Sequence, residues 1–179
     1  MIEEFKKLKS NDFYLEKPSI KRKNEAKEYV KEFINKNEEL KGLGKLKEVI
    51  NNLTYENYLL YLDKIEKNEI EEVPETTYFL IRREDNKIVG ITNLRHYLNE
   101  RLKKCGGHIG YGIRPTERNK GYAKIGLYLT LLEAKKLNIK NVRVDCKKDN
   151  IQSNKVILKV GGKLYKTVRI DSKEVNLYI

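Results

Sequence analysis

Residues 106–123 have the sequence GGHIGYGIRPTERNKGYA, and this segment decides how the rest of the chain can be arranged. Between His108 and Ile113 a β-forming side chain occupies every second position, which predicts a strand. Pro115 cannot donate a hydrogen bond to a sheet ladder, so the strand ends before it. From residue 118 onward the segment opens an apolar helix that we expect to run to about Leu137.

A strand, a short basic turn and a helix N-terminus together favour the binding of phosphate. The first N–H groups of a helix have no partner within it, and the helix dipole is positive there. Gly121 removes the side chain where a ligand would approach the backbone, and Ala123 is nearly as small. The residues expected to bind phosphate through backbone N–H groups are Arg118, Asn119, Lys120, Gly121, Tyr122 and Ala123. The alternative is a strand–helix turn that needs its glycine for packing alone.

The pattern Arg118-x-x-Gly121-x-Ala123 after a strand resembles the acetyl-CoA signature Q/R-x-x-G-x-G/A of the GNAT superfamily of N-acetyltransferases. The resemblance covers about residues 78–179. It implies an α/β (α+β) GNAT fold, in which helices flank a mixed, mostly antiparallel central sheet. It also implies acetyl-CoA as cosubstrate, a primary amine as acceptor, and contacts from Ile113 and its neighbour Arg114 to the pantetheine arm.

A second resemblance lies at the start of a later predicted helix. Many family members have the pattern N-x-x-A/S-x-x-x-Y-x-x-x-G-F, and this chain places Asn150, Ser153, Ile157 and Gly161-Gly162 at those positions. Ile157 replaces the tyrosine proposed to protonate the leaving thiolate, and an aliphatic side chain cannot donate a proton. Ser153 matches a serine proposed for that role in the bacterial ribosomal-protein N-acetyltransferase branch, so it becomes the candidate acid. Helix capping is the alternative role for Ser153, and also for Asn150, which the resemblance places beside the pantetheine arm.

The general base is less well defined by the sequence. Where the family usually has an acidic residue or histidine, this chain has Gly107 and Ile109. The nearest titratable side chains are His108 and Tyr111, and His96 lies on the preceding strand. A water chain to backbone carbonyls is a further possibility. We expect Cys146, at the end of a strand, to belong to the core rather than to act as a nucleophile.

Length and composition favour a single soluble domain spanning residues 1–179. The hydrophobic fraction is 39% and the charged fraction is 36%, and no apolar run is long enough to cross a membrane. The N-terminus lacks the apolar core of a signal peptide, and two cysteines are too few for a disulfide framework. We therefore expect a cytoplasmic protein, and no spacing of ligands indicates a metal.

The formal net charge of +12 raises the question of nucleic-acid binding. Basic and acidic residues are interleaved along the chain, and no aromatic–basic signature or Cys/His finger is present, so we consider that function unlikely. The charge would instead steer the phosphates of CoA, with Lys120, Lys124 and Lys155 as candidates to reach them. A solvated surface is the alternative role for these lysines.

The remaining segments alternate between strands and helices. Expected strands cover residues 13–15, 76–83, 87–97, 141–146, 164–170 and 175–179, and expected helices cover residues 20–37, 55–72 and 150–160. Thr54 is the expected cap of the second helix, and Asn138 is a plausible left-handed C-cap. We expect residues 99–107 to form a charged loop and one parallel strand pair to flank the phosphate helix.

The sequence does not identify the acceptor amine, which can belong to a small molecule or a peptide. The replacement at Ile157 and the missing base also suit a module that binds acyl-CoA without transferring it. The C-terminal strands suggest a homodimer.

Overall fold

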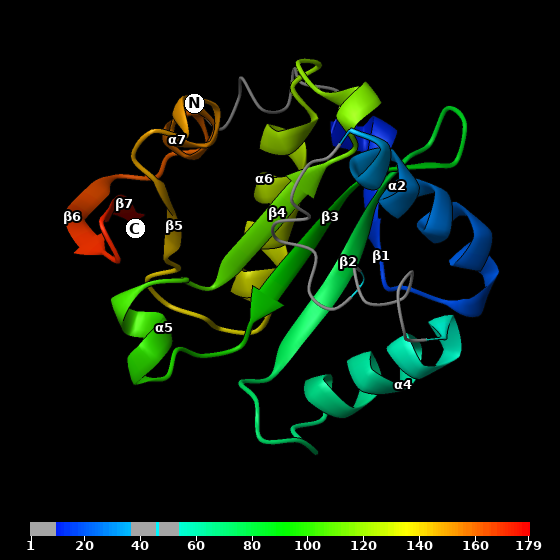
Figure 1. Cartoon of the computed structure of the whole chain (residues 1–179), viewed down its shortest axis with the longest axis horizontal. Coiled ribbons are helices and arrows are strands. Elements are labelled where there is room, and N and C mark those ends of the chain that lie inside the picture. The colour runs from blue at the N-terminus through cyan, green and yellow to red at the C-terminus, as the bar shows by residue number, and fades with distance from the viewer. Residues whose placement is uncertain (1–9, 37–45, 47–53) are drawn as a thin grey trace.

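The computed structural model describes residues 10–36, 46 and 54–179, which form two adjoining sheets with helices on both faces (Figure 1). The strands are β1 Phe13–Glu16, β2 Glu75–Arg82, β3 Lys87–Arg95, β4 Ile109–Ile113, β5 Val144–Lys147, β6 Leu164–Ile170 and β7 Lys173–Tyr178. The helices are α2 Lys23–Asn35, α4 Tyr55–Glu66, α5 Glu100–Lys104, α6 Tyr122–Lys136 and α7 Ile151–Lys159. Short 3-10 turns lie at η1 Ser10–Asp12, η2 Ile20–Arg22 and η4 Pro115–Glu117.

The first sheet has the strand order β1-β2-β3-β4, and every neighbouring pair in it is antiparallel. The second sheet has the order β5-β7-β6 and is antiparallel as well. The hairpin between β2 and β3 turns at Asn86, whose φ of 56° is the left-handed conformation that asparagine tolerates. The closing hairpin turns at Asp171 and Ser172, which also have positive φ.

Backbone hydrogen bonding joins the two sheets, in the described part of the chain, just before the N-terminal ends of β4 and β5. The His108 N–H donates to the Arg143 carbonyl at 2.7 Å, and the Arg143 N–H donates to His108 Nδ1 at 3.0 Å. No ladder joins the two strands beyond this point among the described residues. The predicted parallel pairing of these two strands is therefore wrong for the described residues. The strand predicted from residue 141 begins at Val144 because Asn141 has a φ of 53°.

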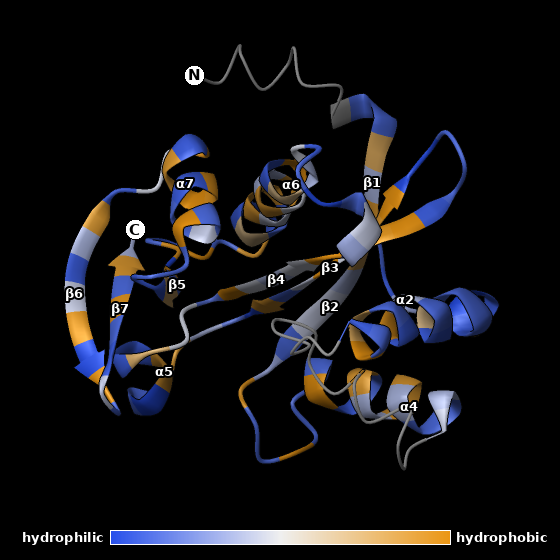
Figure 2. Cartoon of the chain, turned by 45° about the horizontal axis from the view of Figure 1, so that its top comes forward, coloured by the Kyte–Doolittle hydropathy of each residue, from blue (hydrophilic) through white to orange (hydrophobic). Residues whose placement is uncertain are grey.

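Side-chain alternation along β2 and β3 supplies two separate cores. Phe79, Ile81 and Ile91 pack with Tyr29 and Tyr58 under α2 and α4. The opposite face carries Leu80, which packs with Ile125 of α6, and Leu94, which packs with Leu127. Figure 2 shows orange, hydrophobic residues on α6 and on the strands, and helix α6 packs against β3 and β4.

Most predicted elements are confirmed, with changes at their ends. The helix expected from residue 20 begins as η2 and ends at Asn35. Thr54 caps α4 by accepting the Asn57 N–H, as predicted, and Asn138 has the expected left-handed conformation. The segment expected to be a charged loop contains α5, whose cap, Asn99, accepts the Leu102 N–H. The sequence also predicts a polar connection over residues 38–44 and a helical turn over residues 46–50, and apart from Leu46 both lie outside the described residues.

Within the described part of the chain, no helix combines the length and the apolar character needed to cross a membrane.

Candidate functional site

A cleft of about 420 Å³ lies where β4 and β5 separate, between the N-terminus of α6 and the first turns of α7. The predicted site residues that line it are Tyr111, Ile113, Arg118, Asn119, Gly121, Tyr122, Ala123, Asn150 and Ser153. The cleft thus brings together the two segments, 106–123 and 150–162, that carried the sequence resemblance. It exists because the backbone hydrogen bonds between the two segments stop at His108, and no described strand pairs with the β5-facing edge of β4 beyond that point.

The turn before α6 presents backbone N–H groups to this cleft. Gly121 has a φ of 85° and no side chain caps the helix, so the Tyr122 and Ala123 N–H groups have no acceptor among the described residues. A Cβ at Gly121 would meet only Lys124, with the nearest atom at 3.6 Å. Glycine is therefore required by the left-handed backbone and not by close packing. The result is an open, positively polarised helix end.

The Arg118 side chain turns away from the helix end. Its guanidinium lies 5.5 Å from the ring centroid of Phe33 in α2, and its Nε donates to the Ile113 carbonyl at 3.3 Å. Arg118 thus joins the phosphate-binding turn to α2, and it lines the cleft at the same time.

Away from the helix end, two hydroxyl groups in the lining of the cleft lie within hydrogen-bond distance of each other. Tyr111 Oη of β4 lies 2.7 Å from Ser153 Oγ of α7. Burial raises the pKa of Tyr111 to about 12, although the hydrogen bond to Ser153 opposes this. The Cys146 thiol also has a raised pKa, because burial outweighs its hydrogen bond with Ser153. Three polar side chains, one of them a serine exposed to the cleft, therefore meet at the point where the strands separate.

Asn150, and not Ser153, caps α7. Asn150 Oδ1 accepts the Ser153 N–H at 3.1 Å, which leaves the Ser153 hydroxyl free of a capping role. Ile157 is 1% exposed and packs in the core beneath the helix, whereas Val156 lines the cleft. Gly161, with a φ of 98°, ends the helix as predicted.

Comparison with known proteins identifies the family. A sequence model of the acetyltransferase (GNAT) domain matches residues 22–163. The chain belongs to the GNAT acetyltransferase family. No curated protein matches it significantly by sequence. The GNAT fold predicted from residues 106–123 and the assignment as an N-acetyltransferase are thereby confirmed.

Solved structures share this GNAT fold at low sequence identity. RimL, a ribosomal α-N-protein acetyltransferase in complex with coenzyme A, is 15% identical with a TM-score of 0.67, covering 93% of this chain and 92% of its own. The microcin self-immunity acetyltransferase MccE, in complex with acetyl-CoA and AMP, is 19% identical with a TM-score of 0.67, covering 93% and 91%. A ribosomal-protein alanine acetyltransferase from Vibrio fischeri is 16% identical with a TM-score of 0.64, covering 93% and 90%.

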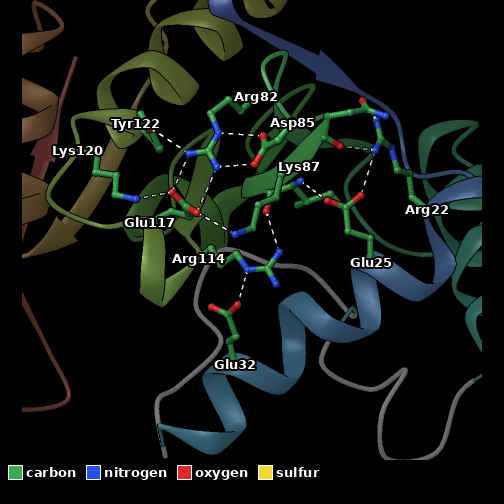
Figure 3. Close-up of polar contacts among 12 residues, drawn as sticks. Arg22, Glu25, Glu32, Arg82, Asp85, Lys87, Arg114, Glu117, Lys120 and Tyr122 are labelled. Atoms are coloured by element: carbon green, nitrogen blue, oxygen red, sulfur yellow. Dashed lines mark hydrogen bonds and ion pairs between the residues drawn. The ribbon is translucent and has the colours of Figure 1, made fainter.

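Arg114, expected to contact the cosubstrate, is turned elsewhere in this GNAT chain. It is 5% exposed and does not line the cleft. Its Nε donates to Glu32 of α2 at 2.6 Å, and its Nη1 donates to the Ile88 carbonyl at 3.3 Å. The guanidinium is committed to these buried partners, so only the backbone of Arg114 is left for the expected contact to the pantetheine arm, which stays a prediction. Arg114 instead ties the end of β4 to α2 (Figure 3).

His108, the first candidate for a general base, also lies outside the cleft. It is 8% exposed, and its Nδ1 accepts the Arg143 N–H where β4 and β5 meet. The pKa of His108 is lowered, mainly by burial and to a smaller extent by the charges of Arg143 and Arg95. His96 lies beyond the end of β3, where its Nε2 is 2.9 Å from Thr76 Oγ1. Neither histidine is placed to receive a proton in the cleft.

Sequence reasoning missed Glu117 at the mouth of the cleft. Its side chain is 5% exposed and accepts hydrogen bonds from Arg82, Lys87 and Lys120, each at 2.9 Å (Figure 3). Lys120 therefore pairs with this carboxylate and does not itself line the cleft. The only local signal was a single acid within an otherwise basic turn. The described residues contain no group of three or more His, Cys, Asp or Glu side chains suited to a metal ion.

Proposed function

We propose that this GNAT enzyme transfers the acetyl group of acetyl-CoA to a primary amine of a small molecule or a peptide. The observation that carries the proposal is the cleft itself, which joins an open helix N-terminus at one end to the Tyr111–Ser153 pair at the other. The first feature suits a pyrophosphate, and the second suits the sulfur of a thioester.

The phosphate end of the cleft combines backbone donors with positive side chains. The Tyr122 and Ala123 N–H groups would receive the pyrophosphate, and Lys124, Lys155 and Lys159 line the same space. The edge of β4 around Ile113 has no partner strand among the described residues, and its backbone groups would meet the amides of the pantetheine arm, with the Ile113 carbonyl shared with Arg118. Asn150 uses its Oδ1 to cap α7, which leaves its Nδ2 group to donate to that arm.

Bound acetyl-CoA supplies a thioester whose sulfur must gain a proton as the amine displaces it. We assign this proton to the Ser153 hydroxyl, which lines the cleft and lies 2.7 Å from Tyr111 Oη, and the proton that the amine loses restores the hydroxyl through water. Burial raises the pKa of Tyr111 to about 12, so the phenol keeps its proton and serves as a hydrogen-bond partner of Ser153. We assign the acceptor's deprotonation to water held by backbone carbonyls, because neither histidine lines the cleft.

Acetyl-CoA titration followed by calorimetry tests the first half of the proposal. We expect saturable binding that weakens with salt, because the phosphates supply much of the attraction. Absence of binding would contradict the use of acetyl-CoA.

Release of free CoA thiol over a panel of amines tests the second half. The panel should include polyamines, aminoglycosides, amino acids and peptides with free N-termini. Amine-dependent release is the expected result. Binding of acetyl-CoA without release for any amine would favour the second candidate function, an acyl-CoA-binding module, which the position of both histidines outside the cleft supports.

A further inference from the structure

Glu117 stands out because a buried carboxylate is found beside a cleft proposed to bind an anion. It closes the 3-10 turn η4 and is nearly inaccessible to solvent. Its Oε2 accepts from Arg82 Nη1 and Lys120 Nζ, and its Oε1 accepts from Lys87 Nζ. Burial alone would raise the pKa of Glu117, but the bonds from Lys120, Lys87 and Arg82 outweigh it and lower the pKa to about 2.

The hydrogen bonds around Glu117 reach both neighbours of Gly121, one directly and one through Arg82. Lys120 precedes Gly121 and bonds to Glu117 directly. Tyr122 follows Gly121, and its hydroxyl accepts from Arg82 Nη1 at 3.1 Å, the same nitrogen that donates to Glu117. Arg82 is itself fixed by Asp85, to which Nε and Nη2 donate at 2.9 and 2.7 Å (Figure 3). Both neighbours of Gly121 are therefore attached to the β2–β3 hairpin through Glu117 and Arg82.

Apart from these bonds, the turn is held by Arg118, which contacts Phe33 of α2 and donates to the Ile113 carbonyl. Asn119 and Gly121 both have left-handed φ, at 63° and 85°, and no side chain caps the helix that follows. An open turn of this kind must be ordered before its N–H groups can converge on one ligand, and ordering it costs conformational entropy. Attachment on both sides of Gly121 removes that cost before binding.

We propose that Glu117 is a positioning residue for the cosubstrate, which holds the turn around Gly121 in the shape that binds the pyrophosphate. This inference rests on the proposed use of acetyl-CoA. The positioning role and simple electrostatics predict opposite effects of removing Glu117 on the affinity for acetyl-CoA. A negative charge beside an anion site weakens binding by Coulomb repulsion, so a Glu117 that acted only by its charge would be inhibitory, and its removal would tighten binding.

The decisive experiment compares acetyl-CoA dissociation constants of the native chain, Glu117→Gln and Asp85→Asn by calorimetry. Asp85→Asn removes the same unit of charge from the same cluster, keeps an oxygen that can still accept from Arg82, and leaves the bonds that Lys120 and Arg82 donate to Glu117. We expect Glu117→Gln to bind roughly tenfold more weakly, the effect of losing charge-assisted hydrogen bonds that order the turn. Asp85→Asn should bind as the native chain does or slightly more tightly. Equal or tighter binding by Glu117→Gln would overturn the proposal.

Amide hydrogen exchange of the ligand-free proteins supplies a local measurement. Glu117→Gln should speed exchange at residues 119–123 and leave α2 and α4 unchanged, whereas general destabilisation would speed exchange throughout. Glu117→Asp keeps the charge but shortens the side chain by one methylene, and it too should weaken binding if geometry governs. Native affinity in Glu117→Asp would contradict the positioning role even if Glu117→Gln did not fold. A native chain that does not bind acetyl-CoA would instead refute the proposed function.

Discussion

Ser153 is the residue at which capping and catalysis can be separated. Its backbone N–H is the group that Asn150 caps, and its hydroxyl faces Tyr111 and the cleft. Ser153→Ala therefore keeps the cap and removes only the hydroxyl. We expect kcat to fall about 10²-fold, the lower range for a positioned acid, with acetyl-CoA affinity nearly intact. Steady-state kinetics with an identified amine, combined with calorimetry, measures both quantities.

Tyr111→Phe is the matched variant for this prediction, because it removes the partner of Ser153 and keeps the ring in the core. It should lower kcat by a smaller factor, since the Ser153 hydroxyl remains. Full turnover of Ser153→Ala, under conditions where chemistry limits the rate, would show that the hydroxyl has no part in proton transfer.

Glu117 also makes a prediction for stability at acid pH. Its pKa is about 2 in the folded chain, against an ordinary value of 4.5. A depressed folded-state pKa means that its contribution is complete above pH 4.5 and is lost as the pH falls toward 2. The free energy of unfolding should therefore fall more steeply between pH 4.5 and 2 in the native chain than in Glu117→Gln, by on the order of 2–3 kcal/mol. Urea unfolding at several pH values measures the difference, and parallel curves would contradict the prediction.

At the scale of elements, the N-terminus of α6 depends on one backbone conformation. Gly121→Glu places bulk and negative charge at the proposed pyrophosphate site, and we expect it to abolish acetyl-CoA binding without unfolding the chain. Gly121→Asn is the control, because asparagine tolerates a φ of 85° better than other residues and adds no charge. Calorimetry and circular dichroism on both variants measure affinity and folding. Unchanged affinity in Gly121→Glu would mean that the turn is purely structural.

At the scale of the whole molecule, the outer edge of β6 is available for self-association. β6 is the last strand of its sheet, and Leu164 and Tyr165 are 54% and 65% exposed. Unpaired strand edges readily add a further strand. We propose that two copies pair through β6 as a homodimer, so sedimentation at about 0.15 M salt, where surface charges are screened, should report twice the 21.1 kDa chain mass. Tyr165→Lys should yield the monomer, and a monomeric native chain would refute the pairing.

The sequence by itself determined the local parts of this protein. Side-chain alternation predicted β4, Gly121 and Ala123 predicted the helix start, and Thr54 predicted a cap, because each depends on neighbours along the chain. The family could be identified from the same short segments, and most residues expected to contact acetyl-CoA do line one cleft.

Only the tertiary structure decided which partners distant side chains have. Three features depend on segments more than thirty residues apart in the chain. They are the separation of β4 from β5, the burial of Arg114 against Glu32, and the hydrogen bond that the Arg143 N–H donates to His108 Nδ1. Glu117 gathers cations from β2, β3 and the phosphate-binding turn. No pattern of local periodicity or spacing encodes such contacts, since they arise from how the packed elements bring charged groups together out of water.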